Sequence, residues 1–146
     1  MGATTEHPGN VMLQHYFATL PVFLTWFPLG ILMLAAFAAA YERITPWREL
    51  ILIRNGNIAA SASYSGALLG YALVLAAVMS AAQSRADLLL WALVGFVVQL
   101  LAFGVARLLL GAGLKARMEA GCGATGLFLG AVSVCAGLIN AATMLG

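Results

Sequence analysis

Long stretches with almost no charge constrain this chain more than any other feature of its sequence. Only 8% of the residues are charged and 63% are hydrophobic, whereas a soluble domain carries about 25% charged residues. So few charges cannot cover a water-soluble surface, and each stretch is long enough to cross a hydrocarbon core of about 30 Å. The sequence therefore predicts an all-α integral membrane protein with four transmembrane helices. The predicted spans are residues 13–40, 57–80, 88–110 and 122–145.

The connections between the spans differ in their basic residues, and this difference predicts the orientation. The connections after the first and third spans are basic, the connection after the second holds only Arg85, and the N-terminal segment holds no Lys or Arg. Because basic connections stay in the cytoplasm, both termini should lie outside. The basic residues at the two cytoplasmic connections are Arg43, Arg48, Arg54, Arg107, Lys115 and Arg117.

Turn and cap residues in the N-terminal half of the chain indicate where helices begin and end. The Thr-Pro pair at residues 45–46 is typical of an N-cap followed by proline at the first helical position. We therefore expect a short interfacial helix there, ended by the Asn-Gly-Asn run at residues 55–57. The Pro-Gly-Asn run at residues 8–10 predicts a loop, so residues 1–12 should form a polar N-terminal segment.

The sequence repeats itself at a fixed offset of 65 residues. Trp26 and Gly30 in the first span correspond to Trp91 and Gly95 in the third. Each unit contains two spans, so the two copies run in the same direction through the membrane. We predict two tandem two-helix repeats related by a parallel pseudo-twofold axis along the membrane normal. The two repeat units are residues 13–81 and 82–146.

Several polar side chains fall within the spans or at their ends. The repeat offset places Glu42 opposite Arg107. These two charges either pair between the repeats or are separately solvated at the interface, and we favour the second interpretation. The amides of Asn57, Gln99 and Asn140 are costly in lipid unless they are satisfied. They either hold helices together, at about 0.6–2 kcal/mol each, or line a solute path, and we favour the first.

Glycines spaced four residues apart indicate close helix packing. Gly66 and Gly70 form one such pair in the second span, and Gly126 and Gly130 form another in the fourth. Small residues let helix backbones approach closely in lipid. These glycines pack helices within one bundle, as we favour, or contact another subunit. Because small residues cover more than one face of the second span, we also predict a homo-oligomer, with a dimer favoured. Spans two and four should supply its contact through these same four glycines.

Catalytic and ligand-binding patterns are not evident in the sequence. It contains no constellation of acid, base and nucleophile, no phosphate-binding loop and no Cys-His spacing typical of a metal site. It also lacks the basic run expected of a nucleic-acid-binding protein. We therefore expect no enzymatic activity, no cofactor, no metal and no nucleic-acid partner. The acidic residues, all placed at interfaces or outside the spans, are Glu6, Glu42, Glu49, Asp87 and Glu119.

Three segments of the chain resemble a bacterial inner-membrane family. They read ITPWREL, IRNGNIAASASYSGALLGYAL and EAGCGATGLFLGAVSVCAGLINAATM. The family is catalogued as domain of unknown function 350 and includes the YjfL-like proteins. The resemblance covers about residues 20–146 and implies two tandem two-span units in the inner membrane, so that both predicted outer termini would be periplasmic. The second unit of the family usually has Gly-Asn where this chain has Gly121-Cys122, so any role of that Asn is lost or moved here.

Two classes of function remain open. The favoured one is a non-enzymatic scaffold or stress-associated membrane subunit that binds a soluble cytoplasmic protein through residues 43–54 and 115–119. The alternative is a small pore or a solute or ion carrier, which the polar residues in the spans and the tandem repeat support. The resemblance implies no activity, and the one partner that the sequence specifies is the lipid bilayer.

Overall fold

Helices dominate the part of the chain that the structure describes. This computed structural model describes the backbone of residues 8–145 and the side chains of residues 12, 13 and 16–145. Within it, four helices are long and apolar enough to cross a membrane, which confirms the predicted all-α fold with four candidate spans. The helices are α1 (Pro8–Ile44), α2 (Glu49–Arg54), α3 (Ile58–Ala81), α4 (Arg85–Leu110), α5 (Leu114–Glu119) and α6 (Gly123–Leu145).

The first helix is longer than the sequence predicts at both ends. It contains 37 residues and already includes residues 8–10, so the predicted loop at those positions is wrong. Proline is well suited to the first helical position, because the N–H that it lacks would have no partner there. Residues 1–7 of the predicted polar segment lie outside the described residues.

The short helix after α1 also begins later than predicted. The Thr45 N–H donates to the Tyr41 carbonyl at 3.0 Å, so Thr45 still belongs to the last turn of α1. Its hydroxyl lies 3.2 Å from the Trp47 carbonyl oxygen. The residue that precedes α2 is Arg48, whose side chain makes no capping bond. The prediction of Thr45 as an N-cap is therefore wrong, although a short helix does lie in this connection.

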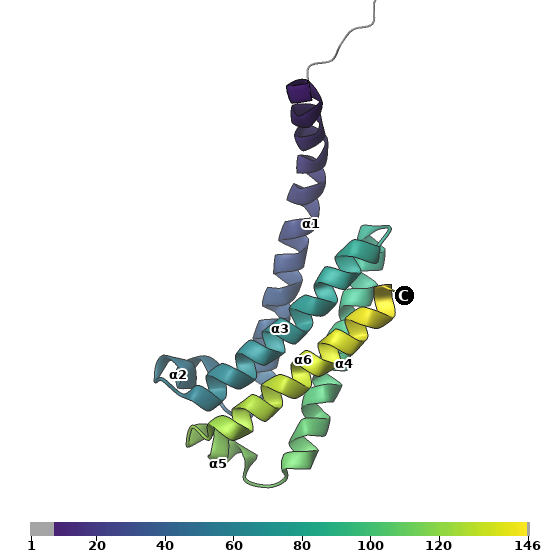
Figure 1. The fold of residues 1–146 in the computed structure, drawn as a ribbon. Coiled ribbons are helices and arrows are strands. Elements are labelled where there is room, and N and C mark those ends of the chain that lie inside the picture. The colour runs from purple at the N-terminus through teal and green to yellow at the C-terminus, as the bar shows by residue number, and fades with distance from the viewer. Residues whose placement is uncertain (1–7, 146) are drawn as a thin grey trace, which may run out of the picture.

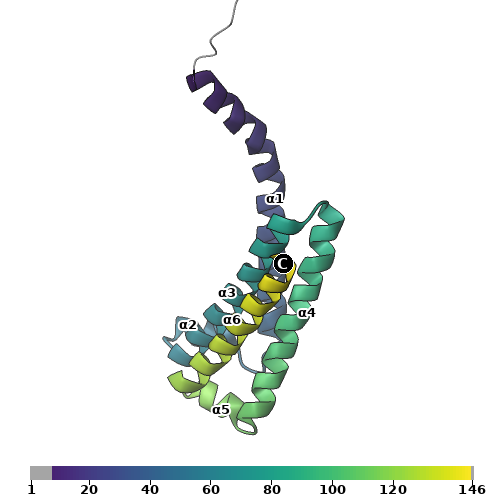
Figure 2. The ribbon, with the colours of Figure 1, turned by 45° about the vertical axis from the view of Figure 1, so that its right-hand side comes forward.

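The long helices form a bundle in which α3 and α6 lie side by side (Figure 1). Both run in the same direction, away from α2 and α5, whereas α1 and α4 run the opposite way (Figures 1 and 2). The short helices α2 and α5 lie together at one end, which we call the basic end. The turn between α3 and α4, residues 82–84, lies at the other end, which we call the hairpin end.

Glycines allow the backbones of α3 and α6 to approach each other closely. A Cβ atom added at Gly66 would meet the backbone of Gly130, and one added at Gly126 would meet the backbone of Ala59. A Cβ at Gly70 would meet the Ser133 carbonyl. The structure therefore places all four glycines singled out above at a contact within one chain, and the facing helix occupies the space beside them.

Aromatic rings fill the bundle between α1, α3 and α4 towards the basic end. Phe37 stacks on Tyr71 with ring centroids 4.5 Å apart, and Tyr41 meets Phe103 edge-on at 5.4 Å. Phe37, Tyr41 and Tyr71 are almost completely buried. Aromatic pairs of this kind contribute about 0.5–1.5 kcal/mol beyond the area that they bury. They connect α1 to the other helices in its C-terminal half.

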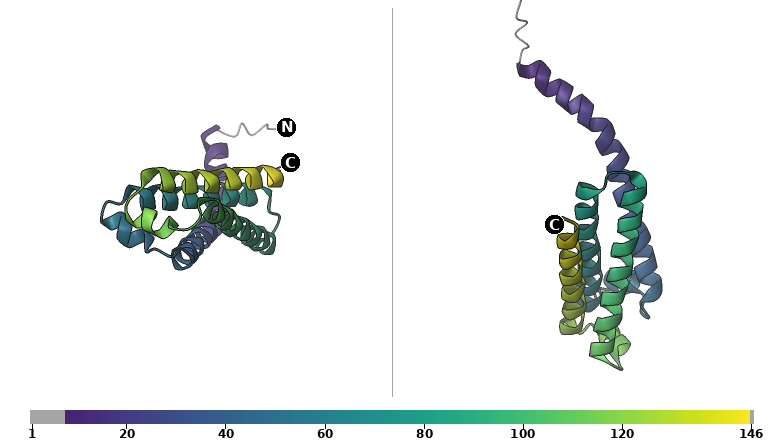
Figure 3. Two further views of the ribbon diagram at one scale, coloured as in Figure 1. Left: turned by 90° about the horizontal axis from the view of Figure 1, so that it is seen from below. Right: turned by 90° about the vertical axis from the view of Figure 1, so that its right-hand side faces the viewer.

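The N-terminal half of α1 extends past the hairpin end of the bundle and leans away from it (Figure 3, right). The whole helix is about 55 Å long at 1.5 Å per residue, longer than a membrane core. Pro21 and Pro28 lie inside it and remove backbone donors. Several large side chains of this half, such as Phe17, Leu20 and Phe23, are at least half exposed.

Candidate functional site at the basic end

The side chain of Asn57 connects the two halves of the chain at the basic end. Its Oδ1 atom accepts a hydrogen bond from the Ala60 N–H at 2.9 Å and thereby caps the start of α3. Its Nδ2 atom donates to the carbonyls of Met118 at 2.8 Å and Glu119 at 3.3 Å, at the end of α5. One amide therefore satisfies a helix N-terminus and a helix C-terminus that are about sixty residues apart in sequence.

Replacing Asn57 by alanine should destabilise the protein by about 2 kcal/mol, because it removes the α3 cap and the side-chain donor to the α5 carbonyls. The Met118 carbonyl keeps the Gly121 N–H at 3.0 Å, whereas the Glu119 carbonyl loses its bond to the amide. Asn57→Asp keeps the capping oxygen but has no donor for those carbonyls, so we expect it to be less stable than the wild type as well. Equilibrium unfolding in mixed detergent micelles measures both. If the Asn57→Asp variant proved as stable as the wild type, the bonds to α5 would contribute nothing.

The second notable side chain at the basic end is Glu49, the first residue of α2. It is 0% exposed, and neither of its carboxylate oxygens has a hydrogen-bond partner among the described residues. The buried Trp47 indole N–H also has none. Nearby, the Tyr41 hydroxyl and Ser63 Oγ lie 3.3 Å apart. The structure thus gathers a carboxylate, an indole and two hydroxyls in a closed polar cluster beneath α2.

Burial away from water raises the pKa of Glu49 to about 7, and the carboxylate of Glu42 acts in the same direction. The nearby polar side chains of Trp47 and Ser63 act in the opposite direction and lower the pKa. Their effect is the smaller one, because neither forms a hydrogen bond with the carboxylate. Desolvation disfavours the charged form of any acid. Glu49 is therefore an acid that gains and loses its proton near neutral pH.

The sequence predicts that Glu49 lies at an interface, whereas in the structure it is completely buried. The flanking Arg48 is exposed, as a charged connection predicts. Glu49 is buried because α2 folds back over α3, where Trp47 and Tyr41 close the cluster. A lone Glu between Arg48 and an apolar tetrapeptide gives no local signal for this, because the covering residues come from other helices.

The other two amides lie inside the bundle, away from Asn57. Gln99 is buried on α4, and its Nε2 atom donates to the Ser133 carbonyl of α6 at 3.1 Å, while its Oε1 atom has no partner among the described residues. Asn140 lies near Gly95, and its Nδ2 atom is likewise without a partner there. Ser133 and Asn140 are about 10 Å apart along α6. The three amides therefore occupy separate levels of the bundle.

Glu42 and Arg107 do not meet in the described part of the chain. Arg107 is exposed and Glu42 is half-buried, and the one salt bridge found among the described residues joins Lys115 to Glu119 at 3.7 Å. Exposed pairs of this kind contribute little to stability. Across all the residues that the structure describes, no group of three or more His, Cys, Asp or Glu side chains is placed to hold a metal ion.

Comparison with known proteins identifies the family. Residues 15–144 match the family described as Domain of Unknown Function (DUF350). The chain belongs to this family. It is also 37% identical over 131 residues to the UPF0719 inner membrane protein YjfL of Escherichia coli K12, a match that covers 90% of this chain and 98% of that protein. The YjfL protein of Escherichia coli O157:H7 matches to the same extent. No solved structure matches the chain.

Membership of this family confirms the resemblance found in the sequence. The matched residues include every part of the basic end described above, from Tyr41 to Asn57 and from Leu114 to Cys122. Cys122 is the residue that directly precedes α6. Its backbone carbonyl accepts from the Thr125 N–H at 3.0 Å. The residue before α3 therefore bonds to two helices through its side-chain amide, whereas the residue before α6 has a thiol side chain.

Proposed function

We propose that this protein is a non-enzymatic scaffold or stress-associated subunit of the bacterial inner membrane, which binds a soluble cytoplasmic protein through its basic end. The name of the YjfL relatives, which are inner membrane proteins of Escherichia coli, supports the inner-membrane location. The observation that carries the proposal is that α2 and α5 both lie at the same end of the bundle (Figure 1). Both helices expose charged side chains there, among them Arg54, Lys115 and Glu119.

Short charged helices that are packed against the bundle are suited to protein recognition, because little conformational entropy is lost when a partner binds. The Asn57 side chain connects α5 to α3, and Trp47, which is buried against Phe103, anchors the start of α2. Leu50 and Ile51 of α2 are about two-fifths exposed and add apolar area next to the charges. This combination of an apolar centre and a charged rim is typical of interfaces.

Site-specific photo-crosslinking in cells tests the scaffold proposal. A photoreactive amino acid at Arg54 or Lys115 should give a crosslinked product with one soluble protein, of the same mass from both positions. The matched control is Leu101 on α4, which is 64% exposed and should contact lipid only. Crosslinking to no protein from either helix, or to the same protein from Leu101, would contradict the proposal.

A small solute or ion carrier is the second candidate function, and the buried carboxylate of Glu49 is the observation that favours it. Ionisable side chains buried in membrane proteins often belong to proton or ion pathways. In proteoliposomes of the pure protein, a carrier of this kind should move protons or cations, and Glu49→Gln should abolish the flux. Wild-type liposomes without flux would remove this candidate and leave the scaffold proposal unaffected.

The proposed topology has two tandem parallel repeats and both termini in the periplasm. The element bounds support the repeat, because α2 and α5 begin 65 residues apart, at Glu49 and Leu114, and have 6 residues each. The glycines that follow them, Gly56 and Gly121, both have positive φ angles, of 78° and 75°. These likenesses are what two copies of one unit would produce.

Cysteine labelling of intact cells tests the orientation. In a variant that lacks Cys122 and Cys135, a cysteine at the exposed Gln83 should react with a membrane-impermeant maleimide. A cysteine at the exposed Arg48 should react only after the inner membrane is permeabilised. The reverse pattern would place the basic end in the periplasm.

We retain the proposal of a homo-oligomer, with a dimer favoured, but move its contact away from the glycines. Because Gly66, Gly70, Gly126 and Gly130 already face the partner helix of the same chain, another surface has to serve. We place the contact on the N-terminal half of α1, because this half exposes many large apolar residues. Native mass spectrometry in mild detergents should show the dimer, and a monomer throughout would contradict it.

A further inference from the structure

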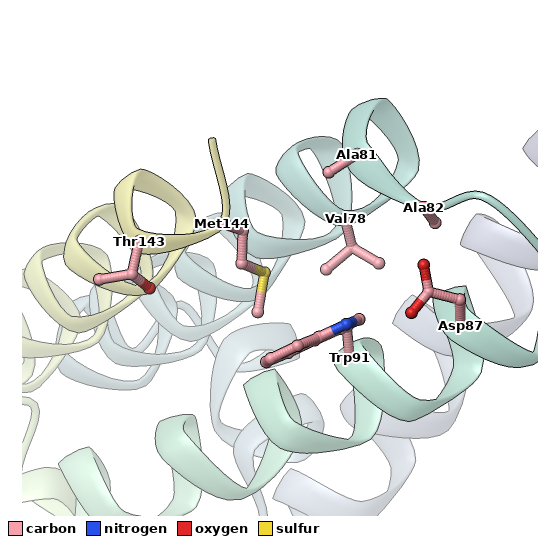
Figure 4. Close-up of a pocket in the computed structure, with 7 residues that line it drawn as sticks. All are labelled: Val78, Ala81, Ala82, Asp87, Trp91, Thr143 and Met144. Carbon is pink, nitrogen blue, oxygen red and sulfur yellow. The ribbon is translucent and has the colours of Figure 1, made fainter. Parts of the chain in front are cut away.

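The hairpin end contains a partly open cavity between the end of α3, the start of α4 and the end of α6 (Figure 4). Its volume is about 380 Å³, within the range of small-molecule sites. The cavity is remote from the basic end and takes no part in the proposed scaffold. Its lining residues are Val78, Ala81, Ala82, Asp87, Trp91, Thr143 and Met144.

Asp87 supplies the one charge in the lining of this cavity. Its position is fixed by local hydrogen bonds: Oδ2 accepts from the Gln83 N–H at 3.1 Å, and its own N–H donates to Ser84 Oγ at 3.1 Å. Among the described residues no cationic side chain lies within salt-bridge distance of Asp87, and Arg85, its nearest basic neighbour in sequence, is exposed. The cavity therefore carries a negative charge that no ion pair neutralises there.

Trp91 lies one helical turn after Asp87 on the same face of α4. In Figure 4 its indole ring lies along one side of the cavity, with Val78 and Met144 across the space and the Asp87 carboxylate at its end. The ring face of tryptophan attracts organic cations. The hydroxyl of Thr143 donates to the Asn140 carbonyl at 2.7 Å, so its oxygen keeps lone pairs that can accept a hydrogen bond.

We propose that this cavity binds an organic ammonium ion, with the cation between the Asp87 carboxylate and the Trp91 ring. The apolar side chains of Val78, Ala82 and Met144 contact the alkyl substituent of the ligand. An anion would be repelled by Asp87, and a neutral apolar molecule would cover the carboxylate without compensating its charge. A metal ion would find one carboxylate in place of the several oxygen ligands that hard cations require.

Two sources can supply such a cation. One is a free primary amine in its protonated form, or a quaternary ammonium ion, on the side of the membrane that the hairpin end faces. The other is the amino headgroup of a phospholipid, because the cavity lies where α3 ends and α4 begins and therefore near the headgroup level. Both sources share the ammonium group that Asp87 and Trp91 recognise, and the experiment separates them.

The test uses the full-length protein purified in a non-ionic detergent. Ethylammonium and tetramethylammonium chloride are titrated by calorimetry, with sodium chloride as the reference for ionic strength. In parallel, native mass spectrometry compares adducts of phosphatidylethanolamine and phosphatidylglycerol with identical acyl chains. We expect saturable binding of an ammonium probe, of phosphatidylethanolamine over phosphatidylglycerol, or of both. The pattern identifies the source.

Asp87→Asn is the informative variant, because its side-chain oxygen can still accept from the Gln83 N–H while the charge is lost. It should weaken binding at least about tenfold. Trp91→Leu should weaken binding about fivefold without altering the helix cap, which guards against a folding defect in the first variant. Glu119→Gln, at the basic end, should bind like the wild type. No binding of either source, or undiminished binding by both cavity variants, would overturn the proposal.

Discussion

Replacing Gly126 by alanine is expected to destabilise the protein by about 3 kcal/mol, the upper end of the usual cost of overpacking. The added Cβ atom would meet the carbonyl oxygen and the Cα atom of Ala59 on α3. Backbone atoms cannot rotate out of the way as a flexible side chain can, so the two helices would have to move apart. Close approach of small residues is the main source of helix association in lipid, and this substitution removes part of it.

Gly104→Ala is the matched control for this prediction. Gly104 also lies inside a long helix, but a Cβ atom added there has nothing within 4 Å. Because alanine favours a helix over glycine by about 1 kcal/mol, Gly104→Ala should be neutral or slightly stabilising. Equilibrium unfolding in mixed micelles should show a loss of stability for Gly126→Ala and no loss for Gly104→Ala. Equal stabilities would show that α3 and α6 do not approach each other at Gly126.

Replacing Glu49 by glutamine is expected to stabilise the protein at pH 8 and to have little effect at pH 4. Burial raises the pKa of Glu49 from 4.5 to about 7, a difference that corresponds to about 3 kcal/mol. Between these two values the folded chain keeps a proton that the unfolded chain has released, so the stability of the wild type falls as the pH rises. Above about pH 7 both states are ionised and the loss is complete.

Glutamine reproduces the shape of the uncharged acid and does not titrate, so the stability difference between Glu49→Gln and the wild type should grow from about pH 4.5 to pH 7. Unfolding free energies measured across this range test the prediction. Glu119→Gln provides the control, because Glu119 is about half exposed and pairs with Lys115. A wild type whose stability relative to Glu49→Gln does not change with pH would show that the carboxylate is hydrated or paired.

Local sequence determined the helices of this protein. Span two was predicted at residues 57–80 and α3 is Ile58–Ala81, because length and hydropathy decide where a helix can cross lipid. The predictions from local sequence were wrong at Thr45 and at residues 8–10. At these positions only a small free-energy difference separates one more helical turn from a loop. Caps and proline positions alone did not resolve it.

The tertiary structure decided the roles of individual polar residues. The sequence indicated that Asn57 lies at a helix start, but its bonds to Met118 and Glu119 depend on a segment about sixty residues away. The glycine spacing predicted close helix contacts and left the partner open, and the fold places that partner in the same chain.

The sequence likewise predicted neither the burial of Glu49 nor the cavity at Asp87. Exposure is a property of the neighbours that cover a residue, and those neighbours come from other helices. Hydropathy and helix length are properties of a continuous segment, so the sequence alone determined the four candidate spans. Whether a charged side chain at the end of a span meets water, a cavity or a closed interior was decided only when the helices packed together.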